Sequence, residues 1–257
     1  MSSPLQHKIF ISTRPKGQSE ELKQLLSASG ADLLEFPMIE ILPVIPDNKL
    51  TDQLNTLAAA QWLIFTSANG VRYFFTLLET SGKKNLLPEN IKCAAIGKKT
   101  ARVLSDIGYN VDVVAKKSNT YDLGNLLIKK ISAGSRVIVV VGSLASGELE
   151  NKLAEKAEVI RMEVYRTLLP EMVNESLLSQ IVEDRYDQLI FTSPSAIKNF
   201  LQTAGDRINA GALRIICIGE TTAAFARKSG IFPSALAESP SADGIYKSIL
   251  NLYNNSK

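Results

Sequence analysis

Two similar stretches, WLIFTSANGVRYFF (62–75) and QLIFTSPSAIKNFL (188–201), reveal the architecture of this 257-residue chain. Each begins with a short apolar run, passes through a polar Thr-Ser turn, and ends in apolar residues at helical spacing. A second pair, CAAIGKKTARVLSDIG (93–108) and IICIGETTAAFARKSG (215–230), has the same form. In both pairs, nearly the same number of residues separates the first member from the second. The two pairs therefore indicate an internal duplication of strand-to-helix units.

Short strand-like runs alternate with helical stretches along the rest of the chain. Several of these runs are continuously apolar, as is typical of parallel strands that helices cover on both faces. The sequence therefore predicts an α/β fold with parallel sheets, and its length suits two domains. The predicted strands are 8–13, 32–36, 61–66, 92–96, 111–115, 136–141, 158–166, 187–192, 214–218 and a weak one near 231–236.

Two longer segments interrupt this alternation at matching places in the two halves. FPMIEILPVIP (36–46) and VIRMEVYRTLLP (159–170) are extended, bounded by proline, and too long for tight turns. They are either edge strands with loops or a pair of strands that carry the chain from one domain to the other.

The composition excludes several classes of site and partner. His7 is the single histidine, and with Cys93 and Cys217 it cannot complete a zinc site, so we expect no metal. A net charge of +3 without clustered Lys or Arg predicts no nucleic-acid partner. The chain contains no G-x-G-x-x-G fingerprint, and GSLASGE (142–148) has Glu148 where a phosphate-binding loop requires lysine.

The expected location is the cytoplasm. The beginning, MSSPLQHKIFIS, lacks the pattern of a signal peptide, and no apolar run approaches the roughly 20 residues that cross a bilayer. Cys93 and Cys217 each lie in an apolar run, which favours free buried thiols in a reducing compartment over a single disulfide.

The repeated strand-to-helix turns supply the candidate binding residues. Ligands of parallel sheets bind beyond the carboxyl ends of the strands, where glycine allows close approach and free helix amides attract anions. Hydroxyl and amide side chains there also cap helices, so each has a structural alternative. The candidates in these turns are Ser67, Asn69, Gly97, Thr100, Ser193, Ser195, Gly219 and Thr222.

Two further residues are candidates because of where they stand. Arg14 follows the first predicted strand and can pair with an anion, or it is a solvated turn residue. Tyr165 lies in the second long segment, beside the presumed cleft, and is a candidate proton donor or an ordinary strand tyrosine.

In order, spacing and duplication, eight motifs together resemble the uroporphyrinogen-III synthase family over essentially the full chain. The resemblance departs in one place, since many relatives carry arginine in the loop where this chain has GSLASGELE (142–150), so no anion contact from such an arginine is expected here. The motifs are STRP (12–15), FPMIEI (36–41), IFTSANGV (64–71), AIGKKTA (95–101), RMEVYRT (161–167), IFTSPSAI (190–197), IGETTA (218–223) and SPSADGI (239–245).

The resemblance implies two similar domains, each a parallel five-stranded sheet flanked by helices, joined by a two-stranded linker. Residues 1–37 and 170–257 would form one discontinuous domain and 44–162 the other, with linker strands at 38–43 and 163–169.

The resemblance also implies the activity. A lyase of this family would convert the linear tetrapyrrole hydroxymethylbilane, which has eight carboxylates, to uroporphyrinogen III, with loss of water and inversion of the last ring. It would use no cofactor and act in an interdomain cleft. Tyr165 would be the acid near the leaving hydroxyl, and Ser67, Thr100, Ser193 and Thr222 would match polar cleft positions. A monomer is expected.

Two rival interpretations remain at this point. A two-lobed binding protein for a small anionic ligand would show the same paired α/β units without catalysis. A regulatory or scaffold module is the other.

Overall fold

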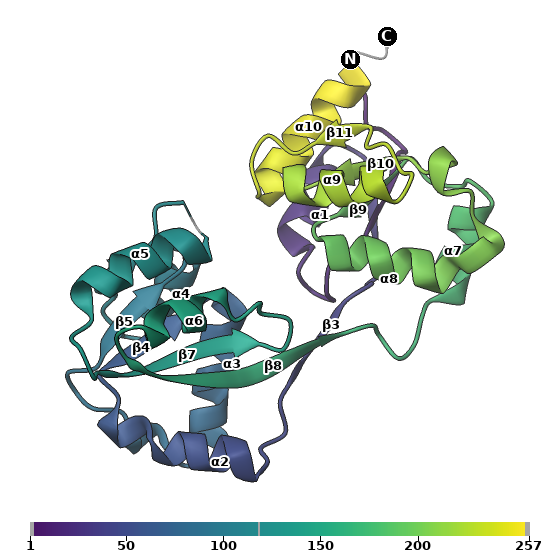
Figure 1. The fold of residues 1–257 in the computed structure, drawn as a ribbon. Coiled ribbons are helices and arrows are strands. Elements are labelled where there is room, and N and C mark those ends of the chain that lie inside the picture. The colour runs from purple at the N-terminus through teal and green to yellow at the C-terminus, as the bar shows by residue number, and fades with distance from the viewer. Residues whose placement is uncertain (1–2, 118, 255–257) are drawn as a thin grey trace. The chain divides into compact units, whose positions relative to one another are not determined.

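A computed structural model of the chain describes residues 3–117 and 119–254. Its contacts divide the chain into two compact units, Met1–Glu40 with Leu168–Lys257 as unit 1 and Ile41–Thr167 as unit 2. Each unit has a parallel sheet with helices packed on it, which confirms the predicted fold class (Figure 1).

Unit 1 combines elements from both ends of the chain. Its strands are β1 (Ile9–Ser12), β2 (Asp32–Glu35), β9 (Gln188–Phe191), β10 (Ile215–Cys217) and β11 (Ala235–Leu236). Its helices are α1 (Glu20–Ala28), α7 (Glu175–Val182), α8 (Pro194–Ala204), α9 (Glu220–Lys228) and α10 (Ala242–Asn254).

Unit 2 is continuous in sequence. Its sheet contains β3 (Glu40–Pro43), β4 (Trp62–Phe65), β5 (Lys92–Ala95), β6 (Val113–Val114), β7 (Arg136–Gly142) and β8 (Glu158–Leu168). Its helices are α2 (Asn48–Asn55), α3 (Ala68–Thr80), α4 (Lys98–Asp106), α5 (Thr120–Lys130) and α6 (Glu148–Ala154).

The two sheets share one strand order. Unit 1 has the order β11-β10-β9-β1-β2, and unit 2 repeats it as β6-β5-β4-β7-β8. The matching stretches 62–75 and 188–201 form β4–α3 and β9–α8, so each supplies the central strand of its sheet. Every residue of these two strands is buried, as their continuous apolar character predicts.

Unit 2 differs from the implied five strands by a sixth, β3, which extends the sheet beyond β8. The backbone N–H of Val44, directly after β3, donates to the carbonyl of Val164 at 3.1 Å. Strand β8 itself runs without interruption from Glu158 to Leu168, and thus includes most of the segment 163–169 that was expected to be a linker.

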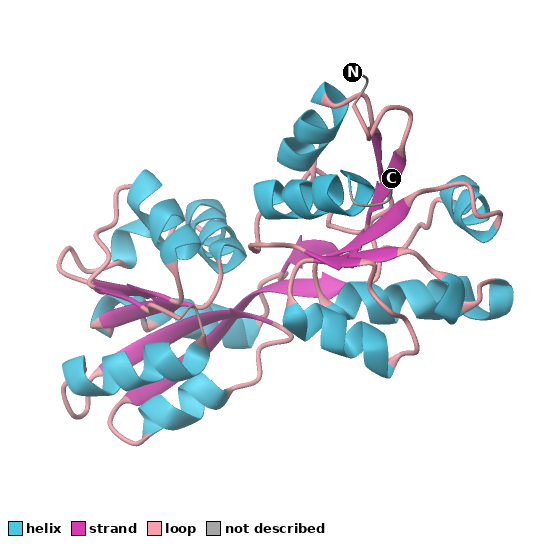
Figure 2. Cartoon of the chain, turned by 90° about the horizontal axis from the view of Figure 1, so that it is seen from above, coloured by secondary structure: helices cyan, strands magenta, loops and turns pink. Residues whose placement is uncertain are grey.

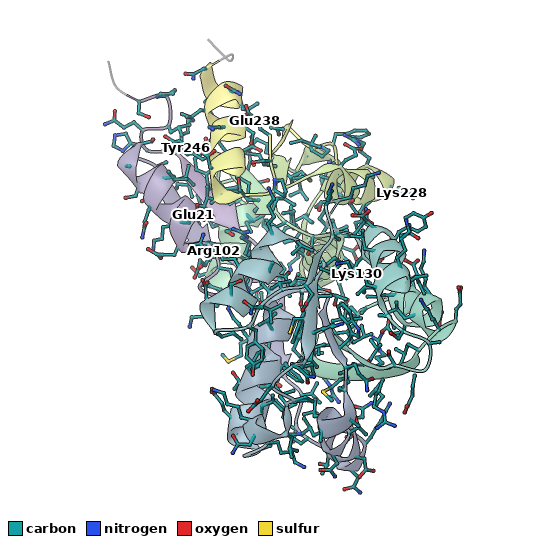
Figure 3. The ribbon with its side chains drawn as sticks, turned by 90° about the vertical axis from the view of Figure 1, so that its left-hand side faces the viewer. Glu21, Arg102, Lys130, Lys228, Glu238 and Tyr246 are labelled. Carbon is teal, nitrogen blue, oxygen red and sulfur yellow. The ribbon has the colours of Figure 1, made fainter. Side chains whose placement is uncertain are left out.

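The central strand β4 divides its side chains between two apolar cores. In β4, Leu63 and Phe65 join the cluster under α3, whereas Trp62 and Ile64 join the cluster that includes residues of α5 and α6. Figure 2 shows helices on both sides of the strands in each unit. Charged side chains such as Glu21, Arg102 and Lys228 are exposed on the outer faces of their helices (Figure 3).

Cys93 and Cys217 are free, buried thiols, which confirms the interpretation of their apolar surroundings. Burial raises the pKa of each to about 12, so both stay protonated at neutral pH. Among residues 3–117 and 119–254, no helix is long and apolar enough to span a membrane. Over those same ranges, no three side chains of His, Cys, Asp or Glu gather into a metal-binding group.

Candidate functional site

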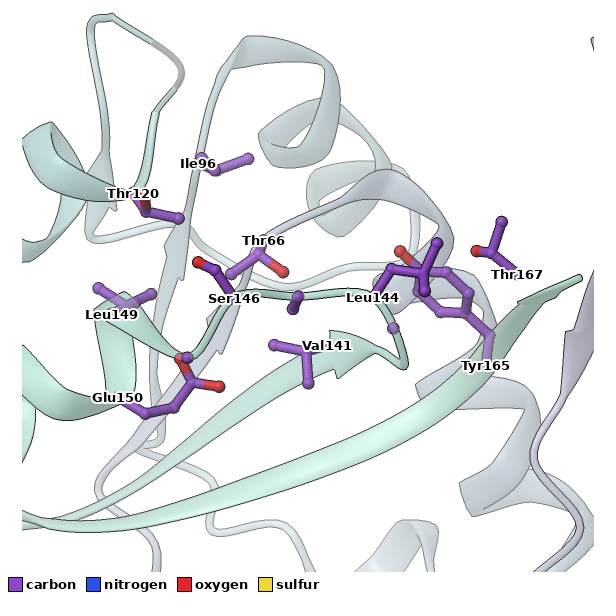
Figure 4. A pocket seen from close by; sticks show the side chains of 13 residues that line it. Thr66, Ile96, Thr120, Val141, Leu144, Ser146, Leu149, Glu150, Tyr165 and Thr167 are labelled. Carbon is purple, nitrogen blue, oxygen red and sulfur yellow. The ribbon is translucent and has the colours of Figure 1, made fainter. Parts of the chain in front are cut away.

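A pocket of about 310 Å³ opens at the carboxyl edge of the unit 2 sheet. The ends of β4, β5, β7 and β8 meet there with the first turns of α5 and α6, as Figure 4 shows. This is the edge at which parallel sheets bind ligands. The lining residues are Thr66, Ile96, Thr120, Val141, Gly142, Leu144, Ala145, Ser146, Gly147, Leu149, Glu150, Tyr165 and Thr167.

Tyr165 is the candidate acid of this pocket, and its hydroxyl has a defined partner. The Tyr165 hydroxyl oxygen lies 3.0 Å from Ser67 Oγ. Its ring stacks on Tyr73 of α3 with centroids 5.7 Å apart and planes inclined by 29°. Burial and the neighbouring Tyr165 raise the pKa of Tyr73. The structure therefore brings together two residues, Ser67 and Tyr165, that are 98 positions apart in sequence.

Ser67 and Ser193 both cap the helix that follows a central strand, so their structural alternative is confirmed. Ser67 Oγ accepts from the N–H of Gly70 at 2.9 Å, and Ser193 Oγ accepts from the N–H of Ala196 at 3.2 Å. The caps have almost identical backbone angles, with φ/ψ of −160°/155° and −158°/154°. Only Ser67 has a tyrosine hydroxyl as a second partner among its recorded contacts in the described part of the chain.

Replacing Ser67 or Ser193 by alanine is expected to lower the free energy of unfolding by about 1 kcal/mol in either case, because each change leaves a helix N–H without its acceptor. Urea denaturation measures both losses. The activities should differ, however, since only Ser67→Ala also removes the contact with Tyr165. A folded Ser67→Ala variant with wild-type activity would contradict a role for Ser67 beyond capping.

The second pair of repeated turns opens α4 and α9. Gly97 and Gly219 precede these helices in extended backbone, with φ of −178° and 175°. A Cβ added at Gly219 would meet no heavy atom within 4 Å, so space is open there. Thr100 and Thr222, one turn later, are buried. Because φ near 180° suits any residue, the glycines are not required by backbone strain.

The three remaining candidates also lie in segments that directly follow strands of their own sheets. Asn69 and Ser195 are half-buried in the first turns of α3 and α8. Arg14 follows β1, and its Nη1 donates to the carbonyl of Gln18 at 3.1 Å. Burial lowers the pKa of Arg14, and Glu21 opposes that effect.

Sequence reasoning missed the charged cluster beside the pocket. Arg161 of β8 donates to Glu150, to Glu163 Oε1 at 3.0 Å, and to the carbonyl of Ala145 at 3.1 Å. Burial alone would lower the pKa of Arg161, but hydrogen bonds to Glu163 and Glu150 raise it overall. The available signal was the pair Arg161 and Glu163, which share one face of a strand at a spacing of two.

The strand of unit 1 that matches β8 is β2, and residues 32–43, which contain it, include no tyrosine equivalent to Tyr165. Asn199 of unit 1 occupies the place of Tyr73 in the repeat. Its Nδ2 donates to the carbonyl of Met38 at 2.7 Å, just as the Tyr73 hydroxyl donates to the carbonyl of Ile41 at 2.7 Å. In both units, the same position of the repeat thus donates a hydrogen bond to the backbone of the segment 38–41. The donor is an amide in unit 1 and a tyrosine hydroxyl in unit 2.

Comparisons with known proteins agree with one another. The family model described as uroporphyrinogen-III synthase HemD matches residues 20–247. The uroporphyrinogen-III synthase of Chlorobaculum parvum is 29% identical over 87% of this chain and 90% of its own. A porphyrin biosynthesis protein HemD of Ruminiclostridium josui is 26% identical over 98% of this chain, which spans about 50% of that relative's length.

A crystal structure also resembles this fold. A mutant uroporphyrinogen III synthase of the extremely thermophilic bacterium Thermus thermophilus matches with a TM-score of 0.66 at 20% identity, covering 96% of this chain and 99% of the other.

Proposed function

The chain belongs to the uroporphyrinogen-III synthase HemD family, and we propose that it closes hydroxymethylbilane to uroporphyrinogen III, with loss of water and inversion of the terminal pyrrole ring. The observation that carries this proposal is the Tyr165–Ser67 pair, whose oxygens lie 3.0 Å apart at a pocket on the carboxyl edge of the unit 2 sheet.

The first step of this reaction is departure of a hydroxyl group, which requires a proton. Ser67 Oγ accepts the N–H of Gly70, so its own hydrogen is free to point at the Tyr165 oxygen. Tyr165 then directs its proton into the pocket. Transfer of that proton to the leaving hydroxyl releases water and leaves a cationic azafulvene, while Ser67 stabilises the phenolate that forms.

The second step selects the product. The substituted carbon of the terminal ring must attack the azafulvene carbon, through a spiro intermediate, because the spontaneous reaction gives the uninverted isomer. Positioning alone decides between these routes. The apolar wall formed by Ile96, Val141 and Leu149 suits the face of a pyrrole ring.

We propose that the carboxylates of the substrate bind at the open strand-to-helix turns of both units. Helix N-termini with free amides attract anions, and hydroxyl side chains add neutral donors. Asn69, Gly97 and Thr100 supply such positions in unit 2, and Ser193, Ser195, Gly219 and Thr222 form the matching set in unit 1. Arg14, which follows β1 of unit 1, adds a positively charged side chain.

The decisive experiment supplies the purified protein with freshly prepared hydroxymethylbilane and separates the uroporphyrinogen isomers after oxidation. We expect the type III isomer at a rate proportional to protein concentration. Formation of the type I isomer alone, at the spontaneous rate, would refute the proposal and leave the two-lobed binding protein as the alternative.

We further propose that the protein acts as a cytoplasmic monomer. Two free buried thiols support a reducing compartment. Light scattering coupled to size exclusion should give a mass near 28.0 kDa.

A further inference from the structure

Strand β8 contains a bulge directly before Tyr165. Its register with β7 pairs Val141 with Glu163 but Gly142 with Tyr165, so Val164 is an extra residue. Two backbone bonds hold this irregularity in place. The carbonyl of Val164 accepts from Val44 at 3.1 Å, and the carbonyl of Tyr165 accepts from Ser143 at 3.0 Å.

The bulge changes the face of the sheet to which Tyr165 belongs. Before it, Met162 pairs with Val140, and both side chains join the core under α3, whereas Val141 joins the opposite core. In unbroken alternation, Tyr165 would share the face of Glu163. The extra residue instead pairs Tyr165 with Gly142, whose place in β7 is on the side of Val140 and therefore of α3.

The ring of Tyr165 occupies the volume that a side chain at position 142 would need. A Cβ added at Gly142 would overlap ring atoms Cε2 and Cζ and would lie 2.8 Å from the hydroxyl oxygen. The ring also stacks on Tyr73, which is itself anchored by its hydroxyl to the carbonyl of Ile41 at 2.7 Å. The ring is thus held in contact with both Gly142 and Tyr73.

We propose that Gly142 is a positioning residue for the cyclisation, because the space left by its missing side chain lets the bulged Tyr165 lie across the end of β7 with its hydroxyl on Ser67. This inference rests on the proposed function. It predicts that position 142 controls kcat through Tyr165 alone, although Gly142 has no group that could take part in the chemistry.

The test combines Gly142→Ala and Tyr165→Ala with the double variant. We expect Gly142→Ala to lower kcat for the type III isomer at least tenfold with KM changed less than threefold. We expect its Tm to fall by about 3–10 °C, since the added methyl overpacks the site. In the Tyr165→Ala background the same substitution should leave kcat within twofold and lower Tm by less than about 2 °C, because the ring is gone.

The matched control is Gly211→Ala in unit 1, where the nearest atom to an added Cβ is Asn209 Oδ1 at 3.6 Å. We expect wild-type kcat and Tm for it. If Gly142→Ala does not fold, recovery of folding in the double variant supports the contact, and failure to recover overturns it.

Two outcomes separate this inference from the proposed function. Suppose that the wild-type enzyme is active. If Gly142→Ala then leaves kcat unchanged, or lowers kcat by the same factor in the wild-type and Tyr165→Ala backgrounds, the inference alone is overturned. A wild-type protein that forms no type III isomer overturns the proposed function itself.

Discussion

Replacing Tyr165 by phenylalanine is expected to lower kcat for uroporphyrinogen III about 10- to 100-fold and to leave KM within about threefold. The variant keeps the ring, and with it the stack on Tyr73. It loses only the hydroxyl that lies 3.0 Å from Ser67 Oγ. A tyrosine hydroxyl is a weak acid near neutral pH, and the substrate is intrinsically reactive, so we place the effect at or below the low end of general acid catalysis. Steady-state kinetics with isomer separation measures it.

The control for this substitution is Tyr109→Phe, which removes a hydroxyl from a tyrosine of the same unit that packs on Phe75 at a ring distance of 4.7 Å. We expect wild-type kcat from it. Complete loss of activity in folded Tyr165→Phe would show that more than proton donation depends on the hydroxyl. Unchanged kcat would remove Tyr165 from the mechanism.

Replacing Arg161 by methionine is expected to raise KM about tenfold while changing kcat much less. Arg161 pairs with Glu150 and Glu163, and Glu150 lines the pocket. Without the guanidinium, the unpaired Glu150 carboxylate of the pocket faces a substrate that carries eight carboxylates of its own. Repulsion of about 1 kcal/mol per close charge pair in a water-like dielectric gives about a fivefold effect for one substrate carboxylate and about thirtyfold for two, so we expect about tenfold. The substitution also removes the hydrogen bond from Arg161 to the carbonyl of Ala145, which fixes the loop before α6.

Two measurements test whether the increase in KM is electrostatic in origin. Added salt should reduce the KM difference, because screening weakens repulsion at an open pocket. Adding Glu150→Gln to Arg161→Met should restore most of the affinity. Arg136→Met is the matched control, since Arg136 forms a comparable pair with Glu158 at 2.9 Å at the opposite end of β7 and β8. A folded Arg161→Met variant with wild-type KM would contradict the assignment.

Local patterns were sufficient for the repeated elements of this chain. Continuous apolar runs identified β4 and β9 as buried strands, and serine before an apolar helical pattern marked both caps correctly. Gly30, Gly108 and Gly230 follow α1, α4 and α9 in the left-handed conformation, with φ of 78°, 89° and 78°, as is typical of glycine just after a helix. These features depend on neighbours within a few residues, which the sequence displays directly.

Periodicity and motif order thus suffice for the α/β class, the duplication and the turns that carry the candidate residues. What those residues do together depends on contacts between distant segments. The direction of Tyr165 depends on a bulge, and a shift of one residue in strand pairing moves a side chain to the other face of a sheet. Glycine at 142 likewise looks like an ordinary loop residue until the ring of Tyr165 is seen in its place. The neutralisation of Glu150 by Arg161 required β8 to lie beside the loop before α6. Each of these contacts joins segments that sheet packing brings together. The periodicity of one strand or helix indicates which of its faces is buried, but not which distant segment packs against that face.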